Sequence, residues 1–333
     1  MSLHTRIQQA EKEGKLSKQL AQSVSQFYDN YQATVQTNKG DLVSLEKDFE
    51  QFLTFVIQQN INPHPFESYH VKIREPIDYF QFGIDFMRPL LVKERSKVLG
   101  IEYVQEMAEV LKKGDNVVLL SNHQSEADPQ FISLLLEGTF PQFAEEIIFV
   151  AGTRVLTDPM AVPLSLGRNL LCIYSKRHIE HPPEEKEGKL LHNQKTMKRM
   201  SQLMAEGGKI IYVAPSGGRD RVDEKGQIPM APFDPQSLEM FFLMARQAAA
   251  KTHFYPFALW TYPLLPPSKT IEKDLGEERN THCAPAGVAF GAQINIEDYP
   301  GNDDPDKRTR RQHRSHHIFR LVSQEYAKIK DLK

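Results

Sequence analysis

The stretch "VVLLSNHQSEADPQ", residues 117–130, joins an apolar run to a group of polar side chains. The run ends abruptly at Asn122-His123, and Asp128 follows five positions after the histidine. Such a run predicts a buried strand, and Asp128-Pro129 is typical of the first turn of a helix. A strand that ends in a histidine and leads into a helix is typical of an α/β fold, in which ligands bind where strands end.

Short apolar runs alternate with helical patterns along the rest of the chain. We predict strands at 116–121, 147–151, 170–174, 209–214, 254–260 and 286–294. We predict helices at 77–94, 101–113, 128–137, 158–165, 186–205, 235–250 and 306–330. This alternation indicates an α/β domain over residues 76–333, with a mixed central sheet flanked by helices.

Residues 1–75 follow a different pattern. Apolar side chains recur at helical spacing in 16–35 and 40–59, and "NPHP" (62–65) ends the second of these segments because proline cannot continue a helix. We therefore expect a small helical-bundle domain at 1–75 that precedes the α/β domain. It carries no cluster typical of catalysis, so we interpret it as a scaffold or a platform for a partner.

The bulk composition excludes several classes of protein. The chain has 333 residues with 41 basic and 43 acidic side chains, a balance that argues against a nucleic-acid binder. It has no apolar run of about 18 residues, so we expect no transmembrane segment. The first residues lack the apolar core of a signal peptide, which favours a soluble protein whose targeting segment is absent or removed.

The motifs of the common cofactor and metal sites are missing. The two cysteines, Cys172 and Cys283, fit no metal spacing, and the chain has neither a Walker loop nor G-x-G-x-x-G. The segment "APSGG" is not a nucleophile elbow, since Ala214-Pro215 precedes Ser216 where that motif requires glycine. We therefore predict no metal, no cofactor and no covalent nucleophile.

His123 and Asp128 are the first candidates for catalysis. Among twelve histidines, only His123 has an aspartate five positions later. In the first turn of a helix, Asp128 could reach Nδ1 of His123 and leave Nε2 free as a general base, a role that suits histidine because it changes charge near neutral pH. The alternative is that Asp128 with Pro129 only caps the helix.

Cationic side chains follow two other predicted strands. Lys176, Arg177 and His178 come after 170–174, while Arg219 and Arg221 follow "SGG" after 209–214. The glycines let the backbone approach a ligand, and arginines bind a phosphate in a bidentate manner. The sequence thus predicts a phosphate site, although solvated surface loops would show the same residues.

Several longer segments resemble the soluble glycerol-3-phosphate acyltransferases of plant chloroplasts and some bacteria, and the resemblance covers nearly the whole chain. The segments are "NHQSEADP", "AGTRVLTDP", "RNLLCIYSKRHI", "IYVAPSGGRDR" and "PFALWTYPLLPP". The resemblance implies transfer of a fatty acyl group from acyl carrier protein or CoA to the sn-1 hydroxyl of glycerol 3-phosphate. This is the first step of glycerolipid synthesis, and it would place the protein in the plastid stroma, as a mature form, or in a bacterial cytoplasm.

The resemblance also implies roles for individual residues. His123 would be the general base with Asp128 as its partner, and the phosphate would be bound by Arg177, His178, Arg219 and Arg221, with Lys176 beside them. The chain departs from the family at Arg177, where plant members are expected to have lysine. It also has "APSGGRDR" where the wider membrane acyltransferase group has roughly F-P-E-G-T-R-S.

Some interpretations stay open at the level of sequence. The apolar segments 82–92, 161–167 and 240–245 could line a groove for the acyl chain or belong to the core. The basic segment 307–314 could bind the acidic carrier protein or be a solvated helix face. Peripheral membrane contact of the protein also stays open. The acceptor could be another phosphorylated alcohol, such as lysophosphatidate, or the protein could bind a phosphorylated ligand or carrier protein without catalysis.

Overall fold

The computed structural model describes residues 2–37, 41–175, 179–268 and 278–332. Within them, one mixed sheet has the strand order β1-β5-β4-β6-β3-β7-β8-β2. The strands are β1 Tyr69–His70, β2 Lys97–Leu99, β3 Asn116–Ser121, β4 Ile147–Gly152, β5 Asn169–Ile173, β6 Ile210–Val213, β7 Thr252–Trp260 and β8 Gly287–Phe290. The β1–β5 and β7–β8 pairs are antiparallel and the other neighbours are parallel, which confirms the predicted mixed sheet.

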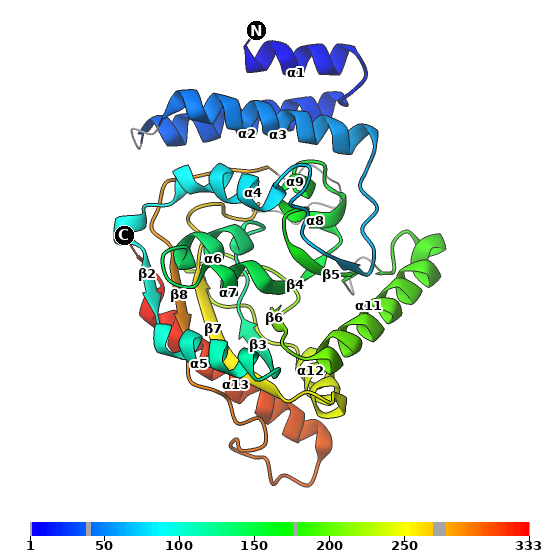
Figure 1. Cartoon of the computed structure of the whole chain (residues 1–333), viewed down its shortest axis with the longest axis vertical. Helices are drawn as coiled ribbons and strands as arrows, with labels where there is room; N and C mark the ends of the chain where they lie inside the picture. The colour runs from blue at the N-terminus through cyan, green and yellow to red at the C-terminus, as the bar shows by residue number, and fades with distance from the viewer. Residues whose placement is uncertain (1, 38–40, 176–178, 269–277, 333) are drawn as a thin grey trace.

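Helices cover both faces of the sheet (Figure 1). One face packs against α5 Ile101–Lys112, α6 Asp128–Leu136 and α7 Pro141–Glu146. The other face packs against α11 Lys186–Glu206, α12 Pro235–Gln247 and α13 Lys307–Ile329. Alternate side chains of β3 serve the two faces: Val117 and Leu119 lie in the first cluster, Val118 and Leu120 in the second.

Strand β3 lies near the middle of the sheet, and this position explains its apolar sequence. All six of its residues are buried, as expected for a strand covered by helices on both faces. Its two neighbours, β6 and β7, both run parallel to it. The carboxyl ends of these three strands therefore meet at one edge of the sheet.

The N-terminal region is helical, as predicted, and consists of α1 Leu3–Lys12, α2 Lys18–Thr37 and α3 Leu42–Ile61. These helices stack at one end of the molecule, with α4 Tyr79–Met87 between them and the sheet (Figure 1). Their buried side chains share one cluster with residues of α4 and α6, including Phe86 and Phe131. The domain boundary at residue 75 remains a prediction.

Two predicted helices are wrong in their bounds. The helix expected at 77–94 ends at Met87 and continues as two 3-10 turns, η1 Arg88–Leu90 and η2 Lys93–Arg95. Pro89 explains this end, because proline has no N–H group to donate within a helix. The helix expected at 158–165 is instead two short helices, α8 Arg154–Thr157 and α9 Val162–Ser165.

The turn between α8 and α9 explains the second difference. Asp158 lies in this turn, and its carboxylate accepts a hydrogen bond from the Met160 backbone N–H at 2.9 Å.

The chain also contains a short 3-10 turn, η3 Pro183–Glu185, before α11. None of the helices within the described residues has the length and apolarity needed to cross a bilayer.

Candidate active site

Three strand ends build the candidate site. Strand β3 leads into residues 122–128, β6 leads into residues 214–221, and β7 leads directly into Thr261 and Tyr262. Because β6, β3 and β7 are adjacent and parallel, these segments emerge at the same edge of the sheet. This edge is where ligands bind in many α/β proteins.

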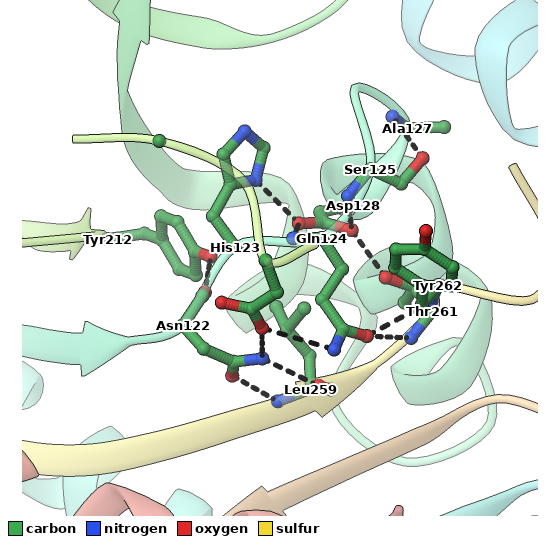
Figure 2. A network of polar contacts seen from close by, with 12 residues as sticks. Asn122, His123, Gln124, Ser125, Ala127, Asp128, Tyr212, Leu259, Thr261 and Tyr262 are labelled. Carbon is green, nitrogen blue, oxygen red and sulfur yellow. Dashed lines mark hydrogen bonds and ion pairs between the residues drawn. The ribbon is translucent and has the colours of Figure 1, made fainter. Parts of the chain in front are cut away.

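His123 and Asp128 are in contact, as the sequence predicted. Nδ1 of His123 lies 2.7 Å from Oδ2 of Asp128 (Figure 2). Only 1% of the Asp128 side chain is exposed, against 32% for His123, so the carboxylate is hidden while the imidazole reaches the surface of the site. An ionised carboxylate can only accept hydrogen bonds, so Nδ1–H donates to it, and Nε2 is the nitrogen that remains to take a proton from a substrate.

The Asp128 carboxylate is held by more than the histidine. Oδ2 also accepts from the backbone N–H of Gln124 at 2.9 Å, while Oδ1 accepts from the Ser125 N–H at 2.9 Å and the Thr261 hydroxyl at 2.5 Å. The N-cap residue of α6 is Ala127, and Asp128 is the first residue of the helix. The structure therefore contradicts the alternative that Asp128 is the helix cap, because its bonds go to the preceding loop and to Thr261, directly after β7.

The loop after β6 reaches the histidine directly. The backbone N–H of Asp220 donates to the carbonyl oxygen of His123 at 2.7 Å. Its chain neighbours Arg219 and Arg221 therefore start beside residues 122–128, the candidate catalytic loop. Gly217 precedes them at φ +65°, a backbone conformation that favours glycine. A Cβ atom at Gly217 or Gly218 would meet no heavy atom of the described chain within 4 Å, so the space beside these exposed glycines is open.

The three other predicted phosphate ligands, Lys176, Arg177 and His178, lie outside the described residues. They follow β5, which is separated from β3 by β4 and β6 in the sheet. The helix that follows them is anchored at the end of β5, because the Thr196 hydroxyl donates to the carbonyl oxygen of Cys172 at 2.7 Å. Their part in the site stays a prediction.

Two buried amide side chains, which the sequence did not single out, hold the strand ends together (Figure 2). Asn122 pairs with the backbone of Leu259, accepting from its N–H at 2.9 Å and donating to its carbonyl oxygen at 3.0 Å. Oε1 of Gln124 accepts from the backbone N–H groups of Thr261 and Tyr262, at 2.9 and 3.0 Å. Both amides also donate to the carboxylate of Asp220.

Tyr262 is a further residue of the site. Burial raises the pKa of its phenol, while Arg221, the Val222 backbone N–H and Arg219 oppose that rise. The phenol therefore lies within the field of both arginines of the predicted phosphate site. Only its place directly after a predicted strand could have drawn attention to Tyr262 in the sequence.

A buried ion cluster supports the catalytic loop from the other side. Arg279 binds Glu126 in a bidentate manner, at 2.5 and 3.1 Å, and Asp158 at 2.9 Å. Burial acts to lower the pKa of Arg279, but Glu126 and Asp158 outweigh this effect and raise it. Thr281, two residues after Arg279, donates a hydrogen bond from its hydroxyl to Oδ1 of Asn30 in α2. The cluster therefore connects residues 122–128 to the N-terminal helices.

Two further expectations can be compared with the structure. Most apolar residues of 82–92, and Leu164 of 161–167, lie in the cluster of the N-terminal helices, while 240–245 contributes to a different cluster on the sheet. The basic segment 307–314 opens α13, whereas the residue of this helix that reaches Gln124 is Tyr326, near its other end. At about 1.5 Å per residue, the basic start lies roughly 20 Å further along the helix.

The described residues contain no cluster of three or more histidine, cysteine, aspartate or glutamate side chains that could hold a metal ion. The chemistry that the visible groups offer is proton transfer by an imidazole held by a buried carboxylate, next to a loop with two arginines. Such a pair activates a hydroxyl group, and such a loop suits an anionic substrate.

Comparisons with known proteins agree with this class of site. The family model described as "Acyltransferase" matches residues 95–260, which run from η2 to the end of β7 and contain His123, Asp128 and both arginines. The match places this part of the chain in the class of proteins that the acyltransferase model describes.

Relatives identify the family more closely. The chain is 41% identical over 289 residues to "Glycerol-3-phosphate acyltransferase, chloroplastic" of Spinacia oleracea, which covers 86% of this chain and 61% of the relative. It is 37% identical to "Glycerol-3-phosphate acyltransferase ATS12, chloroplastic" of Cucurbita moschata, over 95% of this chain and 69% of the relative. It is 34% identical to "Glycerol-3-phosphate acyltransferase, chloroplastic" of Arabidopsis thaliana, over 94% of this chain and 69% of the relative. The chain therefore belongs to the glycerol-3-phosphate acyltransferase family, and it spans about two thirds of the length of these relatives.

Proposed function

We propose that this protein transfers a fatty acyl group from a thioester to the sn-1 hydroxyl of glycerol 3-phosphate, releasing 1-acyl-glycerol 3-phosphate and the free thiol. The observation that carries the proposal is the contact between His123 and Asp128. The loop of residues 214–221, called the arginine loop below, is hydrogen-bonded to the same histidine through Asp220. The names of the relatives support glycerol 3-phosphate as the acceptor.

The mechanism uses His123 as a general base. Nε2 takes the proton of the sn-1 hydroxyl while that oxygen attacks the thioester carbonyl, and Asp128 stabilises the imidazolium that forms. When the tetrahedral intermediate collapses, the carbon–sulfur bond breaks and the imidazolium returns its proton to the leaving thiolate. No covalent bond to the protein is required.

The arginine loop binds the other end of the acceptor. Arg219 and Arg221 hold the phosphate by charge-assisted hydrogen bonds, and Arg177 and His178 with Lys176 complete the site. Binding the phosphate positions the hydroxyl at His123, and such orientation contributes to the rate without a chemical step of its own.

We propose acyl carrier protein or CoA as the carrier of the acyl group. The relatives are named chloroplastic, which supports a plastid location, and within the plastid we propose the stroma. An acidic carrier protein requires a basic surface, and the sequence left open whether 307–314 is that surface or a solvated helix face. The distance of this segment from Gln124 now argues against it as the direct entry of a thioester.

One assay tests the function. Radiolabelled glycerol 3-phosphate is incubated with acyl carrier protein thioester or acyl-CoA, and the labelled product is compared between wild type and His123→Ala. General base catalysis contributes about 10²- to 10⁴-fold, so kcat should fall at least by this range. Near-normal turnover of the alanine variant would show that His123 is not the base. The same incubation is repeated with radiolabelled lysophosphatidate, and product from lysophosphatidate alone would favour the other acceptor.

A further inference from the structure

Asp220 forms hydrogen bonds with three consecutive residues, Asn122, His123 and Gln124. Its backbone N–H donates to the carbonyl oxygen of His123 at 2.7 Å. Its Oδ2 atom accepts from the side-chain amides on either side of the histidine, Asn122 at 2.8 Å and Gln124 at 3.2 Å. The Asp220 carboxylate is therefore joined to residues 98 and 96 positions away in the chain, one on each side of His123.

The other end of the carboxylate is fixed as well. Oδ1 of Asp220 accepts from the backbone N–H of Ala231 at 2.8 Å, and the side chain is fully buried. These hydrogen-bond donors are neutral amides, and a buried carboxylate with such partners costs free energy. A residue needed only to fill this space could be apolar, so the cost suggests a function for the carboxylate.

The place of Asp220 in the chain supplies that function. It stands between Arg219 and Arg221, so whatever fixes Asp220 fixes the starting point of both guanidinium side chains. The two amides it holds are in turn bonded to the end of β7, at Leu259 and Thr261. Hydrogen bonds therefore connect all three strand ends through Asp220 and the two amides.

We propose that Asp220 is a positioning residue, which keeps the arginine loop in register with His123 so that a phosphate bound by the loop presents its hydroxyl to the imidazole. The inference rests on the proposed function and deepens it. Arg219 and Arg221 bind the phosphate, and His123 accepts the proton. Asp220 sets the distance between the bound phosphate and the imidazole.

The test separates positioning from binding. In Asp220→Asn an amide replaces one acceptor oxygen, so at least one N–H donor of the surrounding residues faces another donor and the loop shifts. Because a misplacement of about 1 Å can cost 10²-fold in rate, we expect kcat for glycerol 3-phosphate to fall by about 10- to 100-fold. Inhibition by inorganic phosphate should change less than about threefold, since the arginines remain. Arg219→Ala should instead weaken both phosphate inhibition and the KM for glycerol 3-phosphate.

The matched control is Asp115→Asn. Asp115 is bonded to His253 at 2.9 Å at the opposite end of β3 and β7, far along the strands from the site. This variant changes one aspartate that contacts a histidine outside the catalytic machinery, so kcat should stay within about threefold of wild type. Thermal unfolding of all variants shows whether each is folded at the assay temperature.

Two results would overturn the inference. One is a folded Asp220→Asn protein with kcat within threefold of wild type; the other is phosphate inhibition weakened as much as in Arg219→Ala. If Asp220→Asn does not fold, Tyr326→Phe takes its place, because the Tyr326 hydroxyl accepts from Gln124 at 3.0 Å and helps to orient it. We expect Tyr326→Phe to lower kcat two- to fivefold. An unchanged kcat would reject the positioning role of the hydrogen bonds that join Gln124 and Asp220. Failure of His123→Ala to lose activity would reject the base instead.

Discussion

The carboxylate of Asp128 accepts hydrogen bonds from one imidazole, two backbone N–H groups and one hydroxyl. Four donors of this kind hold the buried carboxylate in place, so its orientation relative to His123 is fixed. The second buried carboxylate of the site, Asp220, accepts hydrogen bonds from amide N–H groups alone among the described residues. In the proposed mechanism the two aspartates have different roles: Asp128 orients His123, and Asp220 positions the loop that carries Arg219 and Arg221.

The pH dependence of stability should reveal Asp220. Burial raises its pKa to about 6, against the lowering effect of bonds from Asn122, the Ala231 N–H and Gln124. Because the folded pKa lies above the unfolded one, the folded state binds more protons between them, and stability falls as the pH rises towards 6 and beyond. Between pH 5 and 7 this group should remove about 1 kcal/mol from the unfolding free energy.

Urea unfolding of wild type and Asp220→Asn across this pH range measures the effect. The asparagine variant cannot titrate at this position, so the stability difference between the two proteins should shrink by about 1 kcal/mol from pH 5 to pH 7. A difference that is constant with pH would show that Asp220 does not titrate in this window.

The sequence predicted part of the site for a clear physical reason. The contact between His123 and Asp128 is local, spanning five residues across a strand end and the first turn of a helix. The partners that complete the site are far away in the chain: Thr261 lies 133 residues from Asp128, and Arg279 lies 153 residues from Glu126. Such pairs depend on strand order, which a periodicity does not show.

At the scale of elements, the central strands were predictable and the edge strands were not. Strands β3, β4, β6 and β7 are buried apolar runs, and their predicted bounds agree within about two residues. Strands β1 and β2 have only two and three residues and lie at the edges of the sheet, so no run of apolar side chains announces them. The two wrong helices fail at prolines and at the turn around Asp158.

The cluster around Arg279 gives a prediction at this scale. It joins the catalytic loop, the turn between α8 and α9, and the segment after β7 through buried ion pairs. Arg279→Met would leave Glu126 and Asp158 buried without their cation, which typically costs about 3–5 kcal/mol. Equilibrium urea unfolding measures the loss.

Arg246→Met is the matched control, because Arg246 also pairs with a carboxylate but at the surface. Half of its side chain is exposed, and so is 60% of its partner Glu297. Exposed pairs contribute at most about 1 kcal/mol, so this variant should remain close to wild type. Equal stability of the two variants would show that the buried cluster does not hold the loop.

At the scale of the whole molecule, the N-terminal helices are part of the core around the site. The ring of Phe86 in α4 stacks on Tyr31 of α2 and on Phe52 of α3, at centroid distances of 5.0 and 4.9 Å. The same helices bond to the segment that carries Arg279, through Asn30 and Thr281. A scaffold role, as the sequence indicated, fits these contacts.

Removal of residues 1–62 tests the scaffold. The truncated chain would expose the apolar face of α4, so we expect loss of the cooperative unfolding transition and strong binding of a hydrophobic dye. Circular dichroism during thermal unfolding, together with dye fluorescence, measures both. A monomeric 63–333 fragment with a sharp transition and wild-type turnover would show instead that the α/β region is independent of these helices.

The central claim is that one acceptor molecule reaches both His123 and the arginine loop. A crystal structure of the complex with glycerol 3-phosphate tests it most directly. The account predicts the phosphate on Arg219 and Arg221, with the sn-1 hydroxyl oxygen about 2.6–3.2 Å from Nε2 of His123. A phosphate bound elsewhere, or a hydroxyl turned away from the imidazole while the phosphate is in place, would contradict it.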